Sequence, residues 1–435
     1  MKTYSKHFSA AQAGIFFLLI NFILSFSLVQ NAECGQNKNK PGTSFTVKVV
    51  NPLKTDRTDQ LVSIPVKKIK IKLPGFDLNT AAAFDGKNQI PVQIEDLNGD
   101  KIPDNLLILV DIKKNEKKNI TVNCGLSSYP KKDFKKRTQA VIETKVDYTM
   151  KEGYYTGGRF QSTDRVEMPA THFAHDAFIK FEGPGWESDK VAYRFYLDSR
   201  NRNDIFAKKI DDVVLQRVGN SDLVSDSKES YTKMCDWGMD VFKVGESLGI
   251  GSIASLVNGK VAAVSKTDKV FSQITADGII KSDLRTIYSG WQTGESKIDL
   301  TSLKSITAGS RLTKEEISFK GKLENICTGL AKHEGCPLIT DSKKNEWSYI
   351  ASYGKQSLAG DNLGLALFFR RADLIKITED DVSLIVILKP VSGKVNYYFA
   401  AAPEMELNGI KSKEDFIKYL DSTAMELSNP LRVEL

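Results

Sequence analysis

Short runs of β-branched and aromatic residues recur along most of the chain, and they restrict its fold more than any other sequence feature. Turn-forming Gly, Asn and Asp separate these runs, which are too short for long helices and read as strands. The clearest runs are residues 45–50, 61–66, 106–110, 120–122, 191–197, 384–388 and 395–400. The pattern predicts an all-β protein.

One helix is expected near the C-terminus. Ser412 and Asp415 resemble a capping box, and Pro430 ends the segment. Between them, Phe416, Leu420, Ala424 and Leu427 recur at helical spacing and fall on one face.

A lysine-rich interval, residues 131–137, has no apolar periodicity and is interpreted as a linker. Residues 42–128 before it suffice for a small β-sandwich. Residues 138–435 after it suffice for one large β-sandwich, which all-β folds build as a single domain.

The N-terminus reads as an export signal over residues 1–32, because Lys2 and Lys6 precede an apolar stretch at residues 10–29. Export to the periplasm is expected, with secretion or a lipid anchor on Cys34 as alternatives. No later stretch reaches about 18 apolar residues, so no further membrane span is expected.

The charge balance argues against a nucleic-acid partner. Lys and Arg number 61 against 54 Asp and Glu, giving +7, and removal of Lys2 and Lys6 with the signal lowers this to +5. The basic clusters are short and lie beside acids, whereas a nucleic-acid binder concentrates its cations. An anionic ligand held by a few placed cations fits better, and the oligomeric state stays open.

Two features raise the question of ions and cross-links. Asp96, Asn98, Asp100 and Asp104 place oxygen side chains at alternating positions, which suits a structural calcium ion. Lys101 stands where an EF-hand loop needs Gly, and no bidentate Glu closes the site, so a plain Asx-rich turn is the preferred interpretation and structural calcium the alternative. Cys327 and Cys336 are either a disulfide across a loop or two unpaired thiols.

The densest polar region spans residues 154–204, and three further segments, residues 231–245, 288–291 and 328–333, have the Gly and aromatic content of loops at a cleft. Imidazole carries protons near neutral pH, guanidinium pairs with carboxylates, and Trp or Tyr covers a sugar face. The candidates are Tyr155, His172, His175, Trp186, Arg194, Arg200, Arg202, Trp237, Lys332 and His333. No nucleophile elbow, Walker loop or dinucleotide fingerprint is present in the sequence.

These segments, in this order, resemble an exported family of Bacteroidota known as domain of unknown function 4861. The resemblance rests on residues 96–104, 172–178, 183–198, 237–245, 328–333 and 397–430. It implies the large β-sandwich shared by mutarotases and several polysaccharide lyases, and a place in uronate-polysaccharide utilisation. Some such proteins are associated with dehydration of a terminal uronic acid in ulvan oligosaccharides.

The resemblance thus suggests a carbon–oxygen lyase that removes water across C4 and C5 of a non-reducing-end uronic acid. Chemistry then assigns the roles, with no cofactor required. His172 or His175 would be the base and Tyr155 or His333 the acid. Arg194, Arg200 or Arg202 would neutralise the carboxylate. The alternative is a sugar-binding or mutarotase-like protein using the same cleft.

Overall fold

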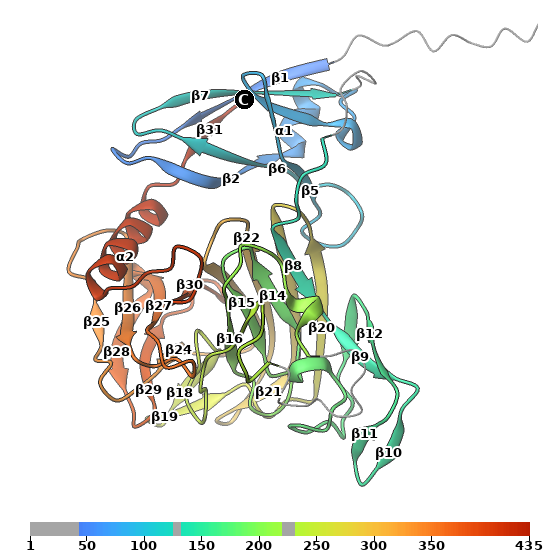
Figure 1. Ribbon diagram of the computed structural model, residues 1–435, viewed down its shortest axis with the longest axis vertical. Coiled ribbons are helices and arrows are strands. Elements are labelled where there is room, and N and C mark those ends of the chain that lie inside the picture. Colours follow the sequence, from blue (N-terminus) through green and yellow to red (C-terminus); the bar gives the residue numbers. More distant parts are fainter. Residues whose placement is uncertain (1–42, 125–131, 220–230) are drawn as a thin grey trace, which may run out of the picture. The chain divides into compact units, whose positions relative to one another are not determined.

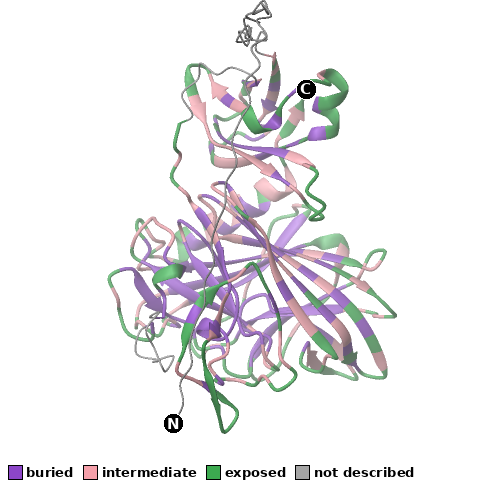
Figure 2. Ribbon diagram, turned by 90° about the vertical axis from the view of Figure 1, so that its right-hand side faces the viewer, coloured by how far each residue is buried: buried purple, intermediate pink, exposed green. Residues whose placement is uncertain are grey.

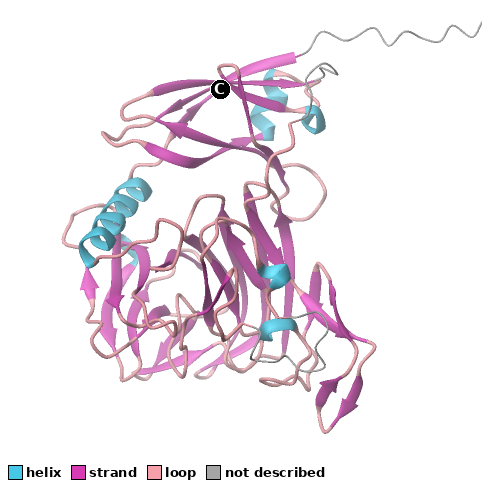
Figure 3. Ribbon diagram, viewed as in Figure 1, coloured by secondary structure: helices cyan, strands magenta, loops and turns pink. Residues whose placement is uncertain are grey.

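The computed structural model describes residues 43–124, 132–219 and 231–435, so the expected signal at residues 1–32 and Lys131 of the expected linker lie outside it. Within these ranges strands dominate, and α1 (Val66–Lys72) and α2 (Lys413–Ser428) are the two α-helices (Figure 3). The predicted all-β class is confirmed. Neither helix has the length and apolar character needed to span a bilayer.

Two sheets enclose the core of a small β-sandwich. A five-stranded sheet has the order β31-β1-β7-β3-β4 and a three-stranded sheet the order β2-β6-β5. The strands are β1 (Thr43–Val50), β2 (Arg57–Pro65), β3 (Ala82–Asp85), β4 (Asn88–Ile90), β5 (Val92–Glu95), β6 (Asn105–Ile112), β7 (Lys117–Cys124) and β31 (Arg432–Glu434). Val47, Ile64, Ile108 and Ile120 pack in this core with no exposed surface. Among the described residues, the last strand, β31, therefore pairs with the first strand, β1, at the edge of this sheet (Figure 1).

The large β-sandwich has a nine-stranded sheet of order β13-β20-β21-β22-β23-β30-β27-β26-β25. Its strands are β13 (Arg165–Glu167), β20 (Lys269–Asp277), β21 (Lys281–Thr293), β22 (Ser296–Thr307), β23 (Leu312–Lys320), β25 (Ile339–Thr340), β26 (Trp347–Gly354), β27 (Leu363–Arg370) and β30 (Lys394–Pro403). One continuous core joins this sheet to two five-stranded sheets (Figure 2).

The two five-stranded sheets have the orders β17-β16-β15-β14-β8 and β19-β18-β24-β29-β28. Their strands are β8 (Thr138–Val141), β14 (Gly185–Ser188), β15 (Ala192–Phe195), β16 (Asn203–Lys208), β17 (Gly238–Asp240), β18 (Ala254–Val257), β19 (Lys260–Ala263), β24 (Ile326–Ala331), β28 (Leu374–Glu379) and β29 (Ser383–Leu388). Two small ribbons add β9 (Glu143–Val146) with β12 (Arg159–Ser162), and β10 (Thr149–Lys151) with β11 (Tyr154–Thr156).

Side-chain alternation gives the β15–β16 pair two different faces. Tyr193 and Phe195 point into the large core, whereas Ala192 and Phe206 belong to a second apolar cluster with Phe181. Since strand residues alternate in direction, Arg194 lies on the face of Ala192. This outer face carries the Arg194 ion pairs described below.

The C-terminal helix matches the sequence prediction. Ser412 is its N-cap, and its hydroxyl accepts a hydrogen bond from the Asp415 N–H at 3.1 Å. Phe416 and Leu420 are fully buried against the outer face of the nine-stranded sheet. Arg57 of β2 donates to the Asn429 carbonyl at 2.9 Å, which satisfies a helix-terminal acceptor.

The expected linker forms neither helix nor strand at residues 132–137, and β8 begins at Thr138. Arg137 pairs with Asp59 of β2 at 2.6 Å and with Asp189, which follows β14, at 2.8 Å. The segment is therefore ion-paired with both sandwiches. The predicted domain boundaries stay predictions. Cys327 and Cys336 are both free thiols, so they form no disulfide in this structure.

Candidate functional site

The backbone between β13 and β14 is unusually strained. His175, Ala177, Phe181 and Glu182 have φ angles of 69°, 66°, 39° and 70°, a region that costs non-glycine residues energy. At Gly183 a Cβ would lie 1.8 Å from the Phe195 carbonyl oxygen, so no side chain fits there. Strain concentrated in so few residues is typical of functional sites.

His172 is held by a carboxylate within this segment. Its Nδ1 lies 2.7 Å from Asp176 Oδ2, and the two side chains are 5% and 1% exposed. Asp176 also accepts the backbone N–H of Phe178 at 2.9 Å. The buried Nε2 of His172 has no hydrogen-bond partner among the described residues. A ring that donates from Nδ1 presents a lone pair at Nε2, which is the arrangement of an oriented general base.

A cavity of about 190 Å³ lies beside His172. Three loops line it: residues 168–172, the β15–β16 turn at residues 197–201, and residues 264–270. Its volume is below the range for drug-sized ligands, about 300–1,000 Å³. It suits one small polar unit. Asp198, Asp268 and Lys269 bring charge to its lining, and Asp268 pairs with Lys297 outside it.

The second histidine belongs to a row of alternating charges behind the same turn. His175 Nδ1 contacts Glu182, whose other oxygen lies 3.1 Å from Arg200 Nη2. Arg200 also pairs with Asp198 at 2.6 Å and stacks on the Tyr196 ring at 3.9 Å from its centroid. His175 is half exposed, so this row runs from solvent to the cavity lining.

A buried network continues from this row on the outer face of the sheet. The register of β15 and β16 sets Arg194 opposite Asp204, and Nη2 of Arg194 lies 2.7 Å from both Asp204 and Asp240. The Tyr196 hydroxyl donates to Asp204 at 2.5 Å. Burial, together with the Asp204 carboxylate, raises the pKa of Asp240 to about 7 although Arg194 lowers it.

The structure brings together four residues expected from the sequence: His172, His175, Arg194 and Arg200. Arg194, however, is only 4% exposed and its guanidinium is surrounded by protein acceptors, so its observed contacts are structural. Arg202 turns elsewhere. It donates to the Ser247 and Arg200 carbonyls and lines a different cavity of about 480 Å³.

The positions of Trp186 and Trp237 do not fit the expected contact with a sugar. Trp186 has no exposed surface, stacks on Tyr193 and donates to Thr313, while Trp237 is 2% exposed. Neither ring offers a face to a sugar in this structure. Tyr155 is 5% exposed, and burial and the nearby Asp176 carboxylate raise its pKa.

The two remaining candidates lie after β24. Lys332 pairs with Glu379 at 2.9 Å. His333 contacts the Phe242 ring, two residues beyond Asp240, and burial together with Lys243 lowers its pKa. Both residues are absent from the lining of the cavity beside His172.

The Asp96 loop is an Asx-rich turn whose carboxylates accept backbone N–H groups. Asp96 accepts from Gly99 and Lys101, each at 2.7 Å, and Asp104 accepts from Leu97 at 2.7 Å. Among the described residues, no group of three or more His, Cys, Asp or Glu side chains is placed to hold a metal. A structural calcium ion at Asp96, Asn98, Asp100 and Asp104 stays a prediction.

Several site residues were given no role from the sequence: Asp176, Glu182, Tyr196, Asp198, Asp204, Asp240 and Lys269. A signal existed for some of them. Asp176, for example, follows His172 by four residues.

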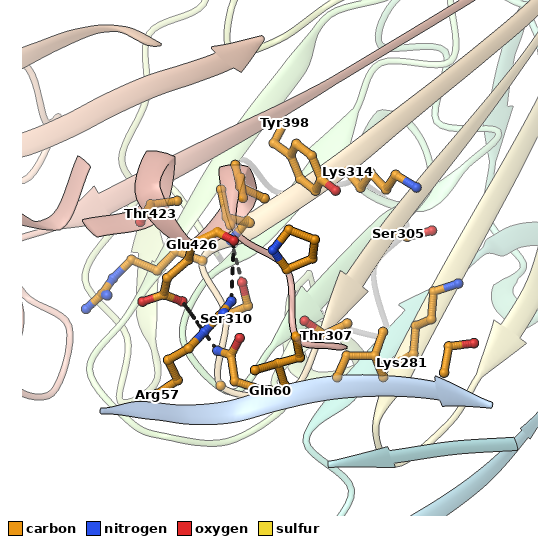
Figure 4. A pocket seen from close by; sticks show the side chains of 18 of the residues that line it. Arg57, Gln60, Lys281, Ser305, Thr307, Ser310, Lys314, Tyr398, Thr423 and Glu426 are labelled. Carbon is orange, nitrogen blue, oxygen red and sulfur yellow. Dashed lines mark hydrogen bonds and ion pairs between the residues drawn. The ribbon is translucent and has the colours of Figure 1, made fainter. Parts of the chain in front are cut away.

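Another pocket, of about 750 Å³, is lined by β2, β22, β23 and α2 (Figure 4). The four cations in its lining each meet a carboxylate: Arg57 meets Glu426, Lys281 meets Glu95, Arg311 meets Glu406 and Lys314 meets Glu316. It lacks a histidine in its lining. It is therefore a weaker candidate for proton-transfer chemistry than the cavity beside His172.

Comparison with known proteins assigns the chain to a family. A family model described as a domain of unknown function (DUF4861) matches residues 49–433. Similar solved structures include an α-mannosidase from Enterococcus faecalis V583, with 9% identity and a TM-score of 0.39 over 90% of this chain and 46% of that one. A glycosyl hydrolase family 38 protein from Enterococcus faecalis has 8% identity and a TM-score of 0.42 over 90% and 47%. The chain thus spans less than half of each. No curated protein matches it.

Proposed function

Since the chain belongs to the family of domain of unknown function 4861, whose description names no activity, we propose its function from the site. The proposal is a carbohydrate-active dehydratase, a carbon–oxygen lyase. It eliminates water across C4 and C5 of the non-reducing-end uronic acid of an ulvan-type oligosaccharide and leaves an unsaturated uronyl residue. The protein acts after export, in the periplasm.

The observation that carries the proposal is the Asp176–His172 pair beside the cavity. Elimination begins when the C5–H bond breaks and its proton moves to a base. His172 Nε2 has the free lone pair, and Asp176 holds the ring in place and balances the positive charge that it gains.

The second half of the reaction needs an acid. As the C4–O bond breaks, its electron pair leaves with the 4-oxygen, which takes a proton and departs as water, while the C5–H electron pair forms the C4–C5 double bond. We assign the acid to His175, whose ring is half exposed and contacts Glu182. His175, like Tyr155 and His333, is not part of the cavity lining. We prefer it because Glu182 joins it to Arg200, which pairs with the cavity-lining residue Asp198.

Cleavage of C5–H is easier when the neighbouring carboxylate is neutralised. Lys269 lines the cavity, and its pairing with Glu167 is long at 3.5 Å and exposed, so its ammonium group is available. We propose that Lys269 meets the substrate carboxylate, while Arg200 fixes Asp198 in the lining. The small cavity volume supports action on one terminal sugar residue.

The test is incubation with a saturated uronate-terminated oligosaccharide, followed by ultraviolet absorbance of the conjugated product and by mass spectrometry. The expected result is rising absorbance with loss of one water from the substrate mass. Unchanged absorbance and mass with the folded protein would exclude the dehydratase.

One observation favours a second candidate, a sugar-binding or mutarotase-like protein. Arg200 already pairs with two carboxylates, which balance its positive charge. It would therefore hydrogen-bond neutral sugar hydroxyls more readily than it would neutralise a uronate. Calorimetric binding of the oligosaccharide without any change of mass would support this candidate. A faster equilibration of sugar anomers would identify mutarotation.

A further inference from the structure

The β10–β11 hairpin extends from the large sandwich (Figure 1). The hairpin and the loop beside it expose several large apolar side chains. Tyr148, Met150 and Tyr154 of the hairpin region are 41%, 48% and 46% exposed, and Phe173 of the loop is 37% exposed. Tyr148 and Met150 lie on the Tyr155 side of the hairpin, whereas Tyr154 and Phe173 contact each other. Single exposed apolar residues are ordinary, but two exposed rings in contact indicate a surface that binds a ligand.

Strand alternation separates the two adjacent tyrosines. Tyr155 turns inward, where it packs on Phe178 with 4.9 Å between ring centroids, whereas Tyr154 turns outward and meets the Phe173 ring edge-to-face at 5.2 Å. Gly153 has a φ angle of 87°, and a Cβ there would lie 3.3 Å from Phe173 Cε1. The turn therefore needs glycine both for its backbone and for the close approach of Phe173.

This exposed pair is fixed to the proposed base. Asp176 Oδ2, which holds His172 Nδ1 at 2.7 Å, also accepts the Phe173 N–H at 3.2 Å. The Asp176 carbonyl accepts the Tyr155 N–H at 2.9 Å, which docks the hairpin. One residue thus positions the base, the Phe173 ring and the strand that carries Tyr154.

A cation lies beside the two rings. Lys151 is the cross-strand partner of Tyr154, so its side chain lies on the same face of the hairpin. Lys151 is exposed and makes no ion pair among the residues the structure describes. Aromatic faces with an available ammonium group beside them suit sugar rings that carry anionic groups.

We propose that Tyr154, Phe173 and Lys151 form a subsite for the sugar residue next to the terminal one of an anionic oligosaccharide. The rings cover the apolar face of that sugar, and Lys151 meets its negative charge. This inference rests on the proposed function, because it takes His172 to mark the position of the terminal residue.

The test compares two ligands by calorimetry: methyl glucuronoside, which fills only the terminal position, and a uronate-terminated ulvan tetrasaccharide. Tyr154→Ala and Phe173→Ala should each raise the Kd of the tetrasaccharide about two- to tenfold and leave that of methyl glucuronoside unchanged. Lys151→Gln should weaken the salt dependence of tetrasaccharide binding. Ile375→Ala, an equally exposed apolar residue on β28 at 53%, is the control and should change neither Kd.

Turnover measured in parallel separates this inference from the proposed function. Unsaturated product with a tetrasaccharide Kd unaffected by both ring variants would exclude the subsite and keep the dehydratase. The expected Kd changes without unsaturated product would keep the subsite and exclude the dehydratase. No tetrasaccharide binding by the parent protein would overturn both. Dissociation of an oligomer by Tyr154→Ala, with Kd unchanged, would instead assign the patch to a contact between copies.

Discussion

At the scale of single residues, the three histidines of the described chain have different surroundings, and their variants should separate accordingly. We expect His172→Asn to reduce turnover about a hundred- to ten-thousand-fold, because it removes the base, and His175→Asn to reduce it through loss of the acid. His333→Asn should stay near the parental rate. Each variant must first melt like the parent. Parental rates in all three would exclude elimination by histidine.

Asp240 predicts how stability depends on pH. Its pKa is raised to about 7 in the folded protein from an ordinary value of 3.8, so between these values the folded state binds more protons than the unfolded state. Its contribution is therefore greatest at low pH and is lost as pH rises through about 7. Asp240→Asn should flatten the fall in melting temperature between about pH 4 and pH 7. An unchanged slope would contradict the prediction.

Residue types were predictable at this site, but their roles were not. The density of His and Arg in residues 154–204 indicated a polar cluster. Sequence alone does not reveal that β15 and β16 pair in a register that gives Arg194 to Asp204. Nor does it show that Trp186 fills the core while Tyr154 is exposed. In each strand, a shift of one residue in the register would turn the side chain to the other face of the sheet.

At the scale of elements, α2 depends on a residue far from it in sequence. Arg57 donates to the Asn429 and Glu426 carbonyls at 2.9 and 3.4 Å and is almost fully buried. Arg57→Ala should lower the free energy of unfolding by about 1–3 kcal/mol, because it leaves buried acceptors unsatisfied. Chemical denaturation measures this. Arg165→Ala, an exposed residue paired only with its neighbour Asp164, should have little effect.

The Asp96 loop offers a test with and without metal. We expect EDTA to leave the melting temperature unchanged, because backbone N–H groups already satisfy the carboxylates of Asp96 and Asp104. A melting temperature that EDTA lowers and added Ca²⁺ restores would show that the loop binds a structural calcium ion. Asp100→Asn would then weaken the effect of calcium.

Element type was more predictable than element partnership. The seven apolar runs all lie in or overlap strands, and Ser412 caps α2 as expected, because local periodicity and capping chemistry decide these features. The short helix α1 at Val66–Lys72 was missed, since its sequence alternates like a strand. Pairing of β31 with β1 is set by tertiary packing and leaves no local signal.

At the scale of the whole molecule, β31 is the feature to test. Val433 opposes Val49, and Leu431, Val433 and Leu435 pack on the small core. Deletion of residues 431–435 should therefore destabilise the small sandwich and speed amide hydrogen exchange in β1, while the large sandwich keeps its protection. Glu434→Gln, which removes only an exposed ion pair with Lys48, is the control.

The pairing of the last strand with the first also has a consequence for the order of events during synthesis. At about 5–20 residues per second, β31 leaves the ribosome tens of seconds after β1. Throughout that interval β1 has an unpaired edge at Lys48–Val50, a place where another strand can add. Chaperones that bind the nascent chain would therefore protect it best if they cover β1 until residues 432–434 have been synthesised.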